Sequence, residues 1–451
     1  MLSPINQRIK QRGISKMTET TAHLYWDGCD TVALAKEHGT PLYVFSETAI
    51  ETVCQELQTD FLTKYERVRV AYASKAFNSL AILRLVEQAG LCLDVVSGGE
   101  LFTAIQAAYE PEKIEFNGNN KSIEELEMAI SYGVGRIIID SLQELDVIRA
   151  ICREQKKVAK VLFRITPEIT VDTHQYISTG QKDSKFGIPL DEDVLFPQIE
   201  QAIQAPEIDF YGIHFHIGSQ LADNQTHLAA ARVALELIRQ IKERFHYEVK
   251  ELNYGGGFGV HYSEGDVRQP YAYFLDPLMA ETIAYCERHQ LYRPTIVIEP
   301  GRSIVAEAGI SLHTIGSIKE LPGIRKYASI DGGMTDNIRP GLYQATYEGV
   351  LANKMDQPAV ETVTISGKIC ESTDILMKDV KVPKIETGDI FATFTTGAYG
   401  YAMASNYNKI QIPAVVFVKE GQAELVVARQ SYKQLIQNER IPAHLQKEVK
   451  K

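Results

Sequence analysis

The sequence lacks paired cysteines, long apolar runs and an excess of positive charge, and each absence excludes a class of protein. The six cysteines are scattered without CxxC spacing, which fits neither a disulfide framework nor a structural zinc site. No apolar run approaches the roughly 18 residues that a membrane span requires. We therefore expect a protein of the reducing cytoplasm that has no membrane partner.

The charge balance argues against nucleic acid as a partner. Aspartate and glutamate number 58 against 47 lysines and arginines, a net charge of -11, whereas nucleic acids attract basic surfaces. Chemistry on a small molecule is the better expectation. Residues 1–20 are polar and basic and contain no apolar stretch of signal-peptide length, so we expect a disordered extension there, with Met17 as an alternative start.

The middle of the chain alternates short β-rich runs with amphipathic helical patterns. Apolar spacings of three and four, bounded by Gly, Ser or Asn, indicate the helices. Eight such alternations over about 250 residues predict a (β/α)8 TIM-type barrel, which we assign to residues 46–302. The predicted strands are VRVAYA (68–73), LCLDVV (91–96), IEFN (114–117), RIIID (136–140), KVLFRI (160–165), FYGIHFHIG (210–218), ELNYGG (251–256) and TIVIEP (295–300).

The pattern changes beyond the barrel. Residues 303–451 contain β-branched runs separated by Gly, Pro and Asp turns, which predict a mainly β domain, either a sandwich or a partial barrel. Residues 21–45 precede the first barrel strand and end in the run LYVF. We expect this N-terminal segment to join the C-terminal β domain as an extra strand.

Three predicted strands end in residues suited to chemistry. Lys75 follows the first strand, the run Gly255-Gly256-Gly257 follows the seventh, and Glu299 precedes Arg302 after the eighth. Barrels of this type carry their active sites at the carboxyl ends of the strands. Glycine N–H groups can surround a phosphate closely, and an arginine can bind one with two hydrogen bonds.

Each of these features has an ordinary structural explanation when it stands alone. Lys75 could be a surface amine on a buried stem, and the glycine run could be a tight turn. Together they supply what pyridoxal 5′-phosphate needs, namely an amine that forms a Schiff base, a site for the phosphate, and a carboxylate, Glu299, for the ring nitrogen. Pyridoxal 5′-phosphate is therefore the predicted cofactor.

The motif HFHIGSQ places His214 and His216 on the same side of the sixth predicted strand. Such a pair could bind a metal ion, as in barrel amidohydrolases. We find no matching His or Asp pair at the other strand ends, however, and the nearby Arg302 would repel a dication. We therefore predict no metal site. We expect the ring of His216, nearer the strand end, to stack on the cofactor and His214 to lie in the core.

The second domain carries polar loops at GKICESTD (367–374) and DGGMTDNIRPGLYQATY (331–347). Cys370 alone would be a buried structural thiol. Because Glu371 follows it directly in a Gly-flanked loop, it becomes a candidate proton donor. Arg339 and Tyr343 in the other loop would, taken singly, be solvated residues.

Nine motifs, in order, resemble those of diaminopimelate decarboxylases, from about residue 40 to about residue 435 of this chain. This family belongs to the alanine-racemase-like pyridoxal-phosphate enzymes, whose relatives include ornithine and arginine decarboxylases. One glycine run or one EPGR is a weak signal, but nine motifs in family order are specific. They are AYASKAF, DVVSGGEL, SKFG, HFHIGSQ, GGGFG, EPGR, DGGMTDNIRP, CESTD and GAYGYAMASNYN.

The resemblance implies a role for each site residue. Lys75 would be the Schiff-base lysine, His216 the imidazole stacked on the ring, and Glu299 the partner of the ring nitrogen. Tyr399 would close over the site. Cys370 would protonate the substrate carbon in the barrel of a neighbouring subunit, which implies a homodimer with shared active sites. The phosphate would lie among Ser219, Gly255, Gly256, Gly257, Gly301 and Arg302.

The far end of the substrate distinguishes the members of such a family. Diaminopimelate ends in a second amino acid group, so its pocket needs a cation for the carboxylate and an acid for the ammonium. Arg339 and Glu371 supply that pair, and Arg302, Tyr343 and Tyr399 add contacts. Since buried charges left unpaired reject the wrong substrate, the sequence favours decarboxylation of meso-2,6-diaminopimelate to L-lysine, the last step of lysine biosynthesis.

Two positions depart from the family pattern: Lys368 stands where proline is frequent, and Phe77 where many members carry a smaller residue. Neither change removes a chemical role. The main alternative is a decarboxylase of ornithine, arginine, D-lysine or D-ornithine. A metal-dependent barrel hydrolase and a non-catalytic pyridoxal-phosphate-binding protein are less favoured; the latter could dispense with Cys370, Glu371 and Arg339.

Overall fold

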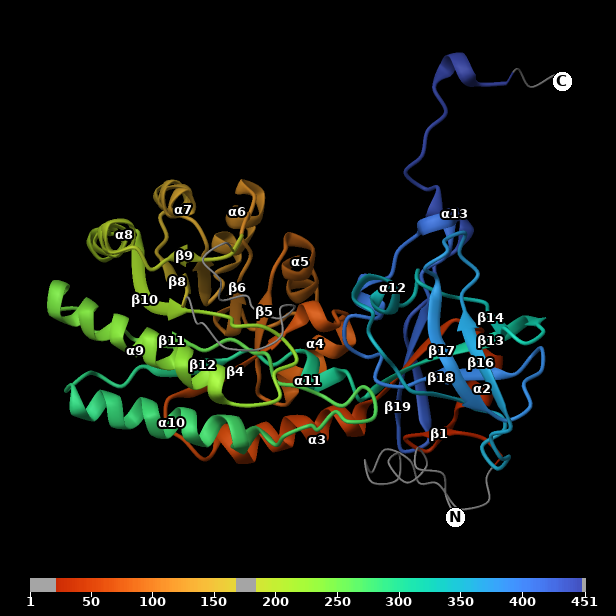
Figure 1. The fold of residues 1–451 in the computed structure, drawn as a ribbon. Helices are drawn as coiled ribbons and strands as arrows, with labels where there is room; N and C mark the ends of the chain where they lie inside the picture. The colour runs from red at the N-terminus through yellow and green to blue at the C-terminus, as the bar shows by residue number, and fades with distance from the viewer. Residues whose placement is uncertain (1–21, 168–183, 448–451) are drawn as a thin grey trace. The chain divides into compact units, whose positions relative to one another are not determined.

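The computed structural model describes residues 22–167 and 184–447, and the chain divides into two compact units. The barrel unit comprises Thr48–Ala308 together with the short segment Gly397–Ala402. The β unit combines the chain up to Glu47 with Gly309–Thr396 and with the chain from Met403 onward. Figure 1 shows the helices and strands of each unit. The predicted disordered extension, residues 1–20, lies outside the described residues.

Eight parallel strands of the barrel unit form a closed ring, which confirms the predicted fold class. Consecutive strands pair in parallel, and the ring closes through the pairs β12–β4 and β10–β8. The sixth strand ends at His214, short of the predicted Gly218. The barrel strands are β4 (Val68–Ala73), β5 (Cys92–Val95), β6 (Ile114–Phe116), β7 (Arg136–Ile139), β8 (Ala159–Thr166), β10 (Ile208–His214), β11 (Glu251–Asn253) and β12 (Thr295–Ile298), and the short β9 (Ile188–Pro189) pairs with β8.

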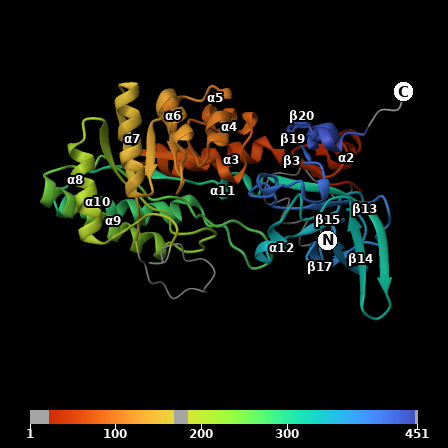
Figure 2. The same cartoon turned by 90° about the horizontal axis from the view of Figure 1, so that it is seen from above.

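The helices of the barrel unit lie outside the strands (Figures 1 and 2). Polar caps fix several of their starts: Ser79 Oγ accepts a hydrogen bond from Ile82 N, and Ser122 and Glu125 form a capping box. The helices are α3 (Glu47–Leu57), α4 (Leu80–Gln88), α5 (Gly98–Gln106), α6 (Ile123–Tyr132), α7 (Leu142–Gln155), α8 (Glu192–Gln204), α9 (Gln225–Phe245), α10 (Tyr271–Arg288) and α11 (Arg302–Val305), with short turns at η1 (Gln58–Leu62), η2 (Ser74–Ala76) and η3 (Pro111–Lys113).

The β unit is built on a mixed sheet in which the early strand β3 (Leu42–Ser46) is central. It pairs antiparallel with β13 (Gly309–Leu321) and parallel with β19 (Ala414–Lys419). Figure 2 shows β13 and β14 (Arg325–Ile330) as a long hairpin. The remaining elements are β1 (Tyr25–Trp26), β2 (Cys29–Asp30), α2 (Thr31–His38), α12 (Arg339–Tyr343), β15 (Gly349–Leu351), β16 (Glu361–Ser366), β17 (Ile375–Val382), β18 (Ile390–Thr393), η5 (Tyr407–Lys409), β20 (Gln422–Val427), α13 (Tyr432–Leu435) and η6 (Ala443–Leu445), with η4 (Tyr401–Met403) at the unit boundary.

Two broad features of the described chain bear on function. No helix within residues 22–167 and 184–447 has the length and apolar character needed to cross a membrane. All six cysteines are free thiols; five are buried, and Cys370 is exposed.

Candidate active site

The carboxyl ends of the barrel strands bring the predicted residues of the barrel unit to one end of the ring. Lys75 lies in η2 directly after β4, and His216 lies two residues beyond the end of β10. The glycine run follows β11, and Glu299 follows β12 directly. Because all eight strands are parallel, the segments that follow them face a common space. The electrostatic influence of Glu299 and of Tyr399 on the Lys75 amine agrees with this convergence.

Opposing effects set the pKa of Lys75, which is half-buried. Burial alone lowers it, but the groups Tyr399, Asp94 and Glu299 raise it above the ordinary value. Neighbouring acidic groups therefore stabilise the ammonium form. An amine held among acids at the rim of a barrel is well placed to bind covalently to an aldehyde once it has lost its proton.

Glu299 is a buried carboxylate, 7% exposed, that accepts hydrogen bonds from three side chains. Asn253 Nδ2 lies 2.9 Å and Asn117 Nδ2 3.1 Å from Oε1, and His214 Nε2 lies 3.1 Å from each carboxylate oxygen. Burial raises the pKa of Glu299, but the contact with His214 and the charge of Lys75 outweigh it and lower the pKa to about 2. Glu299 is thus held ionised at neutral pH.

His214 was expected to be a core residue, and its burial confirms this, but the prediction missed its contact with Glu299. It is buried, at 1% exposure, but its ring contacts the carboxylate of Glu299 rather than apolar side chains alone. The two histidines of HFHIGSQ also differ in position, because β10 ends at His214. No cluster of three or more His, Cys, Asp or Glu side chains suited to a metal ion occurs within residues 22–167 and 184–447.

The ring of His216 is held by the glycine run. Its Nδ1 accepts a hydrogen bond from the N–H of Gly256 at 3.3 Å, which requires Nδ1 to be unprotonated. Burial, followed by the charges of Lys75 and Arg164, lowers the pKa of His216 well below its ordinary value. His216 is therefore a neutral, fixed aromatic ring, as stacking on a flat cofactor requires.

The glycine run occupies space in which no larger residue fits. A Cβ on Gly255 would lie 2.5 Å from the Phe215 carbonyl oxygen, and a Cβ on Gly256 would lie 2.2 Å from that of Glu299. Gly257 has φ +104°, and its Cβ would lie 2.6 Å from the Gly218 carbonyl oxygen.

The backbone N–H groups of the run are not equivalent. Gly255 N–H donates to Asn253 Oδ1 at 2.8 Å, and Gly256 N–H donates to His216. Within the described part of the chain, no protein group accepts from the Gly257 N–H. Gly257 is therefore the amide of the run that is free to bind an anion, while the other two hold the loop in shape.

Arg302 and Ser219 lie together beside the glycine run. The guanidinium donates to Ser219 Oγ through Nε at 3.1 Å and through Nη2 at 3.0 Å, and it also donates to the hydroxyl of Tyr262. The Tyr399 ring centroid lies 4.7 Å from the Arg302 guanidinium carbon. A Cβ on Gly301 would lie 2.8 Å from the Ala73 Cβ, so this approach also requires glycine.

Asp94 and Asn117 belong to the site although sequence reasoning missed them. Asp94 Oδ1 accepts from Asn117 Nδ2 at 2.6 Å, and the same amide nitrogen donates to Glu299. Burial and the charge of Glu299 raise the pKa of Asp94 well above its ordinary value. The two carboxyl groups therefore divide their roles, with a proton favoured on Asp94 and the negative charge on Glu299.

A sequence signal for the missed residues did exist. Each is a polar side chain within a predicted barrel strand, and the inward face of such a strand is enclosed. Polar side chains are rarely enclosed without partners. Several of them at one end of the barrel therefore indicate a functional site there. The missed residues are Asp94, Asn117, Arg164, His214 and Asn253.

The remaining predicted residues lie in the β unit. Cys370 is exposed in the loop after β16, and its backbone N–H donates to Asn408 Oδ1 at 2.8 Å. Arg339, at the start of α12, is 8% exposed, whereas Tyr343, at its end, is 60% exposed and Glu371 is also exposed. The roles of these four residues toward a substrate stay predictions.

Asp374 connects the two predicted loops of the β unit. Its carboxylate accepts from Ile369 N at 2.9 Å and from Met334 N at 2.6 Å. A Cβ on Gly333 or on Gly367 would lie 2.5 Å or less from this carboxylate. The loop of Cys370 and the loop that precedes Arg339 are therefore held against each other by one side chain.

The barrel residues fit pyridoxal 5′-phosphate. The glycine run and Gly301 give close backbone approach that any Cβ would block. Glu299 supplies an ionised carboxylate and His216 a neutral ring, and Lys75 supplies the amine. Lys75, Glu299 and the residues around Arg302 would hold the aldehyde, the ring nitrogen and the phosphate respectively.

Comparisons with known proteins agree with this fit. Residues 49–306 match the family model described as the pyridoxal binding domain of pyridoxal-dependent decarboxylases. The chain is 46% identical over 417 residues to the diaminopimelate decarboxylase of Bacillus methanolicus, covering 92% of this chain and 96% of that protein. It is 44% identical over 414 residues to that of Bacillus subtilis, covering 92% and 94%.

Solved structures resemble the whole described fold. The diaminopimelate decarboxylase of M. jannaschii in complex with L-lysine superposes with a TM-score of 0.90 at 35% identity, covering 96% of this chain and 100% of that one. That of Helicobacter pylori with L-lysine gives a TM-score of 0.82 at 29% identity, covering 90% and 98%. The likeness therefore includes both units.

Proposed function

The chain belongs to the pyridoxal-dependent decarboxylase family, and we propose that it removes one carboxyl group from meso-2,6-diaminopimelate to give L-lysine and carbon dioxide. The observation that carries this proposal is the convergence of an amine, an ionised carboxylate and a glycine run at the carboxyl ends of the barrel strands. Bound at this site, pyridoxal 5′-phosphate supplies a ring that withdraws the electron pair left when carbon dioxide departs.

The barrel residues hold and orient the reacting groups. Lys75 would hold the cofactor through its amine, which can bond to an aldehyde only after it has lost its proton. The Glu299 carboxylate, kept ionised by its three donors, would favour a proton on the ring nitrogen. His216 would pack against the cofactor ring, Arg302 with Ser219 would bind the phosphate, and Tyr399 would cover the site.

Cys370 is the proposed acid that completes the reaction. After carbon dioxide leaves, its thiol transfers a proton to the substrate α-carbon and becomes a thiolate, which solvent then reprotonates. The thiol is exposed in the β unit, so it can reach a second molecule. By resemblance to the family, it serves the barrel of a partner chain, and we propose a cytoplasmic homodimer with two shared active sites.

Residues of the β unit set the proposed substrate preference. Arg339 provides the cation for the distal carboxylate and Glu371 the acid for the distal ammonium, with Tyr343 as a further donor. A substrate that ends in a bare ammonium would lack the carboxylate that Arg339, which is 8% exposed, is proposed to bind. That loss opposes binding of ornithine or lysine.

A side-by-side assay tests this function. We expect the purified chain with pyridoxal 5′-phosphate to release carbon dioxide from meso-diaminopimelate faster than from ornithine, lysine, arginine or the D-amino acids. Faster turnover of ornithine would instead support the alternative decarboxylase. The Lys75→Ala variant should lack the visible absorbance of the covalently bound cofactor and should be inactive; an unchanged spectrum would remove the amine from its role.

A further inference from the structure

Both the oxygen and the nitrogen of the Asn253 side-chain amide form hydrogen bonds inside the barrel. It is the last residue of β11 and is 0% exposed. Its Oδ1 accepts from Gly255 N at 2.8 Å, and its Nδ2 donates to Glu299 Oε1 at 2.9 Å and to Glu115 Oε2 at 2.9 Å. An Asn amide nitrogen has two hydrogens, so both are used. One buried side chain thus contacts the ring-nitrogen carboxylate and the first residue of the glycine run.

The orientation of this amide follows from its partners. If the oxygen and nitrogen of Asn253 were exchanged, the oxygen would face the ionised carboxylate of Glu299, and the NH2 group would face the N–H of Gly255. Both contacts would be repulsive. The assignment of donor and acceptor is therefore fixed by chemistry.

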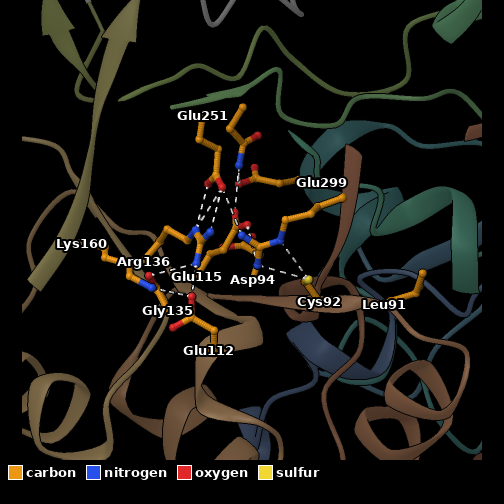
Figure 3. Close-up of polar contacts among 12 residues, drawn as sticks. Leu91, Cys92, Asp94, Glu112, Glu115, Gly135, Arg136, Lys160, Glu251 and Glu299 are labelled. Atoms are coloured by element: carbon orange, nitrogen blue, oxygen red, sulfur yellow. Dashed lines mark hydrogen bonds and ion pairs between the residues drawn. The ribbon is translucent and has the colours of Figure 1, made fainter. Parts of the chain in front are cut away.

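Through its amide nitrogen, Asn253 also contacts a buried cluster of glutamate and arginine side chains. Glu115 and Glu251, which are 0% and 1% exposed, extend into the barrel from β6 and β11 (Figure 3). Arg136 donates to Glu251 through Nε at 3.0 Å and through Nη2 at 3.0 Å, and Arg69 Nη1 donates to it at 3.2 Å. Arg69 Nη2 also lies 3.8 Å from Glu115 Oε1.

These contacts form a continuous chain through the barrel. It runs from Arg136 to Glu251, then through Arg69 to Glu115 and on to Asn253. From Asn253 it continues to Glu299 and Gly255. Figure 3 shows Glu299 beside the glutamates and Arg136. Since these side chains are buried and in contact with one another, they cannot shift independently, and Asn253 is held from both sides.

We propose that Asn253 is a positioning residue that aligns the ring-nitrogen partner Glu299 with the phosphate-binding glycine run. This inference rests on the proposed function, in which Glu299 faces the ring nitrogen and the run contacts the phosphate. Asn253 touches neither the cofactor nor the substrate. It acts by donating to the Glu299 carboxylate and by accepting from the Gly255 N–H, so that two contacts with one cofactor are set by one side chain.

Two substitutions separate these two actions. Asn253→Asp keeps the shape and keeps an oxygen for Gly255, but it places a third carboxyl group between Glu115 and Glu299. Carboxyl groups in direct contact cannot all be ionised at once, so the protonation of this cluster must differ from that in the wild-type protein. Asn253→Ala instead removes both contacts.

The experiment uses the apo protein and two probes, pyridoxal 5′-phosphate and pyridoxal, which lacks the phosphate. The Kd of each probe is measured by its visible absorbance, and the absorbance of bound pyridoxal 5′-phosphate is then followed with pH. Thr282→Val is the matched control, because Thr282 is equally buried and bonds the hydroxyl of Tyr254, the neighbour of Asn253. Thermal unfolding of each apo variant verifies that it is folded.

The expected results differ for each variant. Asn253→Ala should reduce the preference for pyridoxal 5′-phosphate over pyridoxal by about tenfold, the effect of one lost hydrogen bond that shapes the phosphate loop. Asn253→Asp should retain most of that preference, but the pH profile of its absorbance should be shifted relative to that of the wild-type protein. Thr282→Val should match the wild-type protein in both measurements.

A wild-type preference in Asn253→Ala, or a wild-type pH profile in Asn253→Asp, would overturn the inference. If Asn253→Ala does not fold, the pH profile of the isosteric Asn253→Asp decides alone. Failure of the wild-type apo protein to bind either probe would instead contradict the proposed function, so the two failures can be distinguished.

Discussion

At the scale of single residues, ionisation in this barrel depends on position rather than on residue type. Three buried carboxyl groups lie within one connected set of contacts, and their pKa values diverge. The pKa of Glu299 falls to about 2, whereas those of Asp94 and Glu115 rise. Burial raises all three, and only Glu299 has enough donors and positive neighbours to reverse that effect.

Glu115 should make the stability of the chain depend on pH. Burial, against the opposing charge of Arg69 and reinforced by Glu251 and Glu299, raises its pKa in the folded state to about 8. Between the ordinary glutamate pKa and that value, the folded chain binds the proton more tightly than the unfolded chain does. The free energy of unfolding should therefore fall as pH rises across this window.

The Glu115→Gln variant removes this proton. We expect its urea midpoint to vary less between pH 5 and pH 8 (roughly the window given by the linkage relation) than that of the wild-type chain. Glu281→Gln, at the exposed pair of Glu281 with Arg232, is the control and should keep the wild-type slope. Equal slopes for the wild-type chain and Glu115→Gln would show that Glu115 is ionised throughout.

At the scale of elements, the loops that follow the strands determine the site more than the strands do. The run after β11 combines a left-handed backbone with approach distances that exclude a Cβ. Its shape is set by hydrogen bonds to Asn253 and His216. Any change in this loop should therefore affect the phosphate site before it affects the barrel.

Gly257→Ala tests this expectation. The new Cβ would lie 2.6 Å from the Gly218 carbonyl oxygen, and φ is +104°, so the loop must move. We expect the Kd for pyridoxal 5′-phosphate to rise about tenfold or more, as the loss of one or more hydrogen bonds implies. Titration of the apo protein, followed by visible absorbance, measures this change.

Gly265→Ala is the matched control for backbone strain. Gly265 has a similar φ of +98°, but no atom lies within 4 Å of the position that its Cβ would take. The substitution should cost about 1 kcal/mol of stability and leave cofactor affinity unchanged. An equal loss of affinity in both variants would attribute the effect to strain rather than to the crowded loop.

Sequence reasoning predicted the alternation of strands and helices and therefore the barrel, because apolar periodicity reports which faces are enclosed. It extended the sixth strand to Gly218, whereas β10 ends at His214. The pairing of β10 with β8 shifts between Phe210 and Gly212, and such irregularities depend on neighbours that a local pattern does not include.

The prediction of the site was limited in the same way. Lys75, Glu299 and the glycine run could be recognised because each follows a strand as an unusual local group. The contacts of Asn117 and His214 with Glu299 join residues 182 and 85 positions apart, which no local pattern reveals. Tertiary pairing, rather than residue type, turned these side chains into part of the site.

At the scale of the whole molecule, the proposed machinery is divided between the two units. Lys75 and Glu299 belong to the barrel unit, while Cys370 and Arg339 belong to the β unit. The proposed homodimer assigns each barrel a thiol from the partner chain. This arrangement predicts that defects in the two units can complement each other.

Co-expression of Lys75→Ala and Cys370→Ala chains tests the shared site. Each variant alone should be nearly inactive. Random pairing makes half of the dimers mixed, and each mixed dimer has one intact site, so the mixture should show about a quarter of the wild-type activity. A mixture as inactive as its components would place the thiol and the amine of each site in the same chain.

The order of the chain through the β unit has a consequence for its synthesis on the ribosome. Strand β3 is completed at Ser46, but its neighbours β13 and β19 end only at Leu321 and Lys419. All eight barrel strands are synthesised after β3 and before β13 and β19, so the barrel can close before β3 has a partner. Nascent chains that extend beyond Leu321 but not to residue 414 should therefore contain all eight barrel strands and a β3 edge that lacks its partner β19, which chaperones and proteases can recognise.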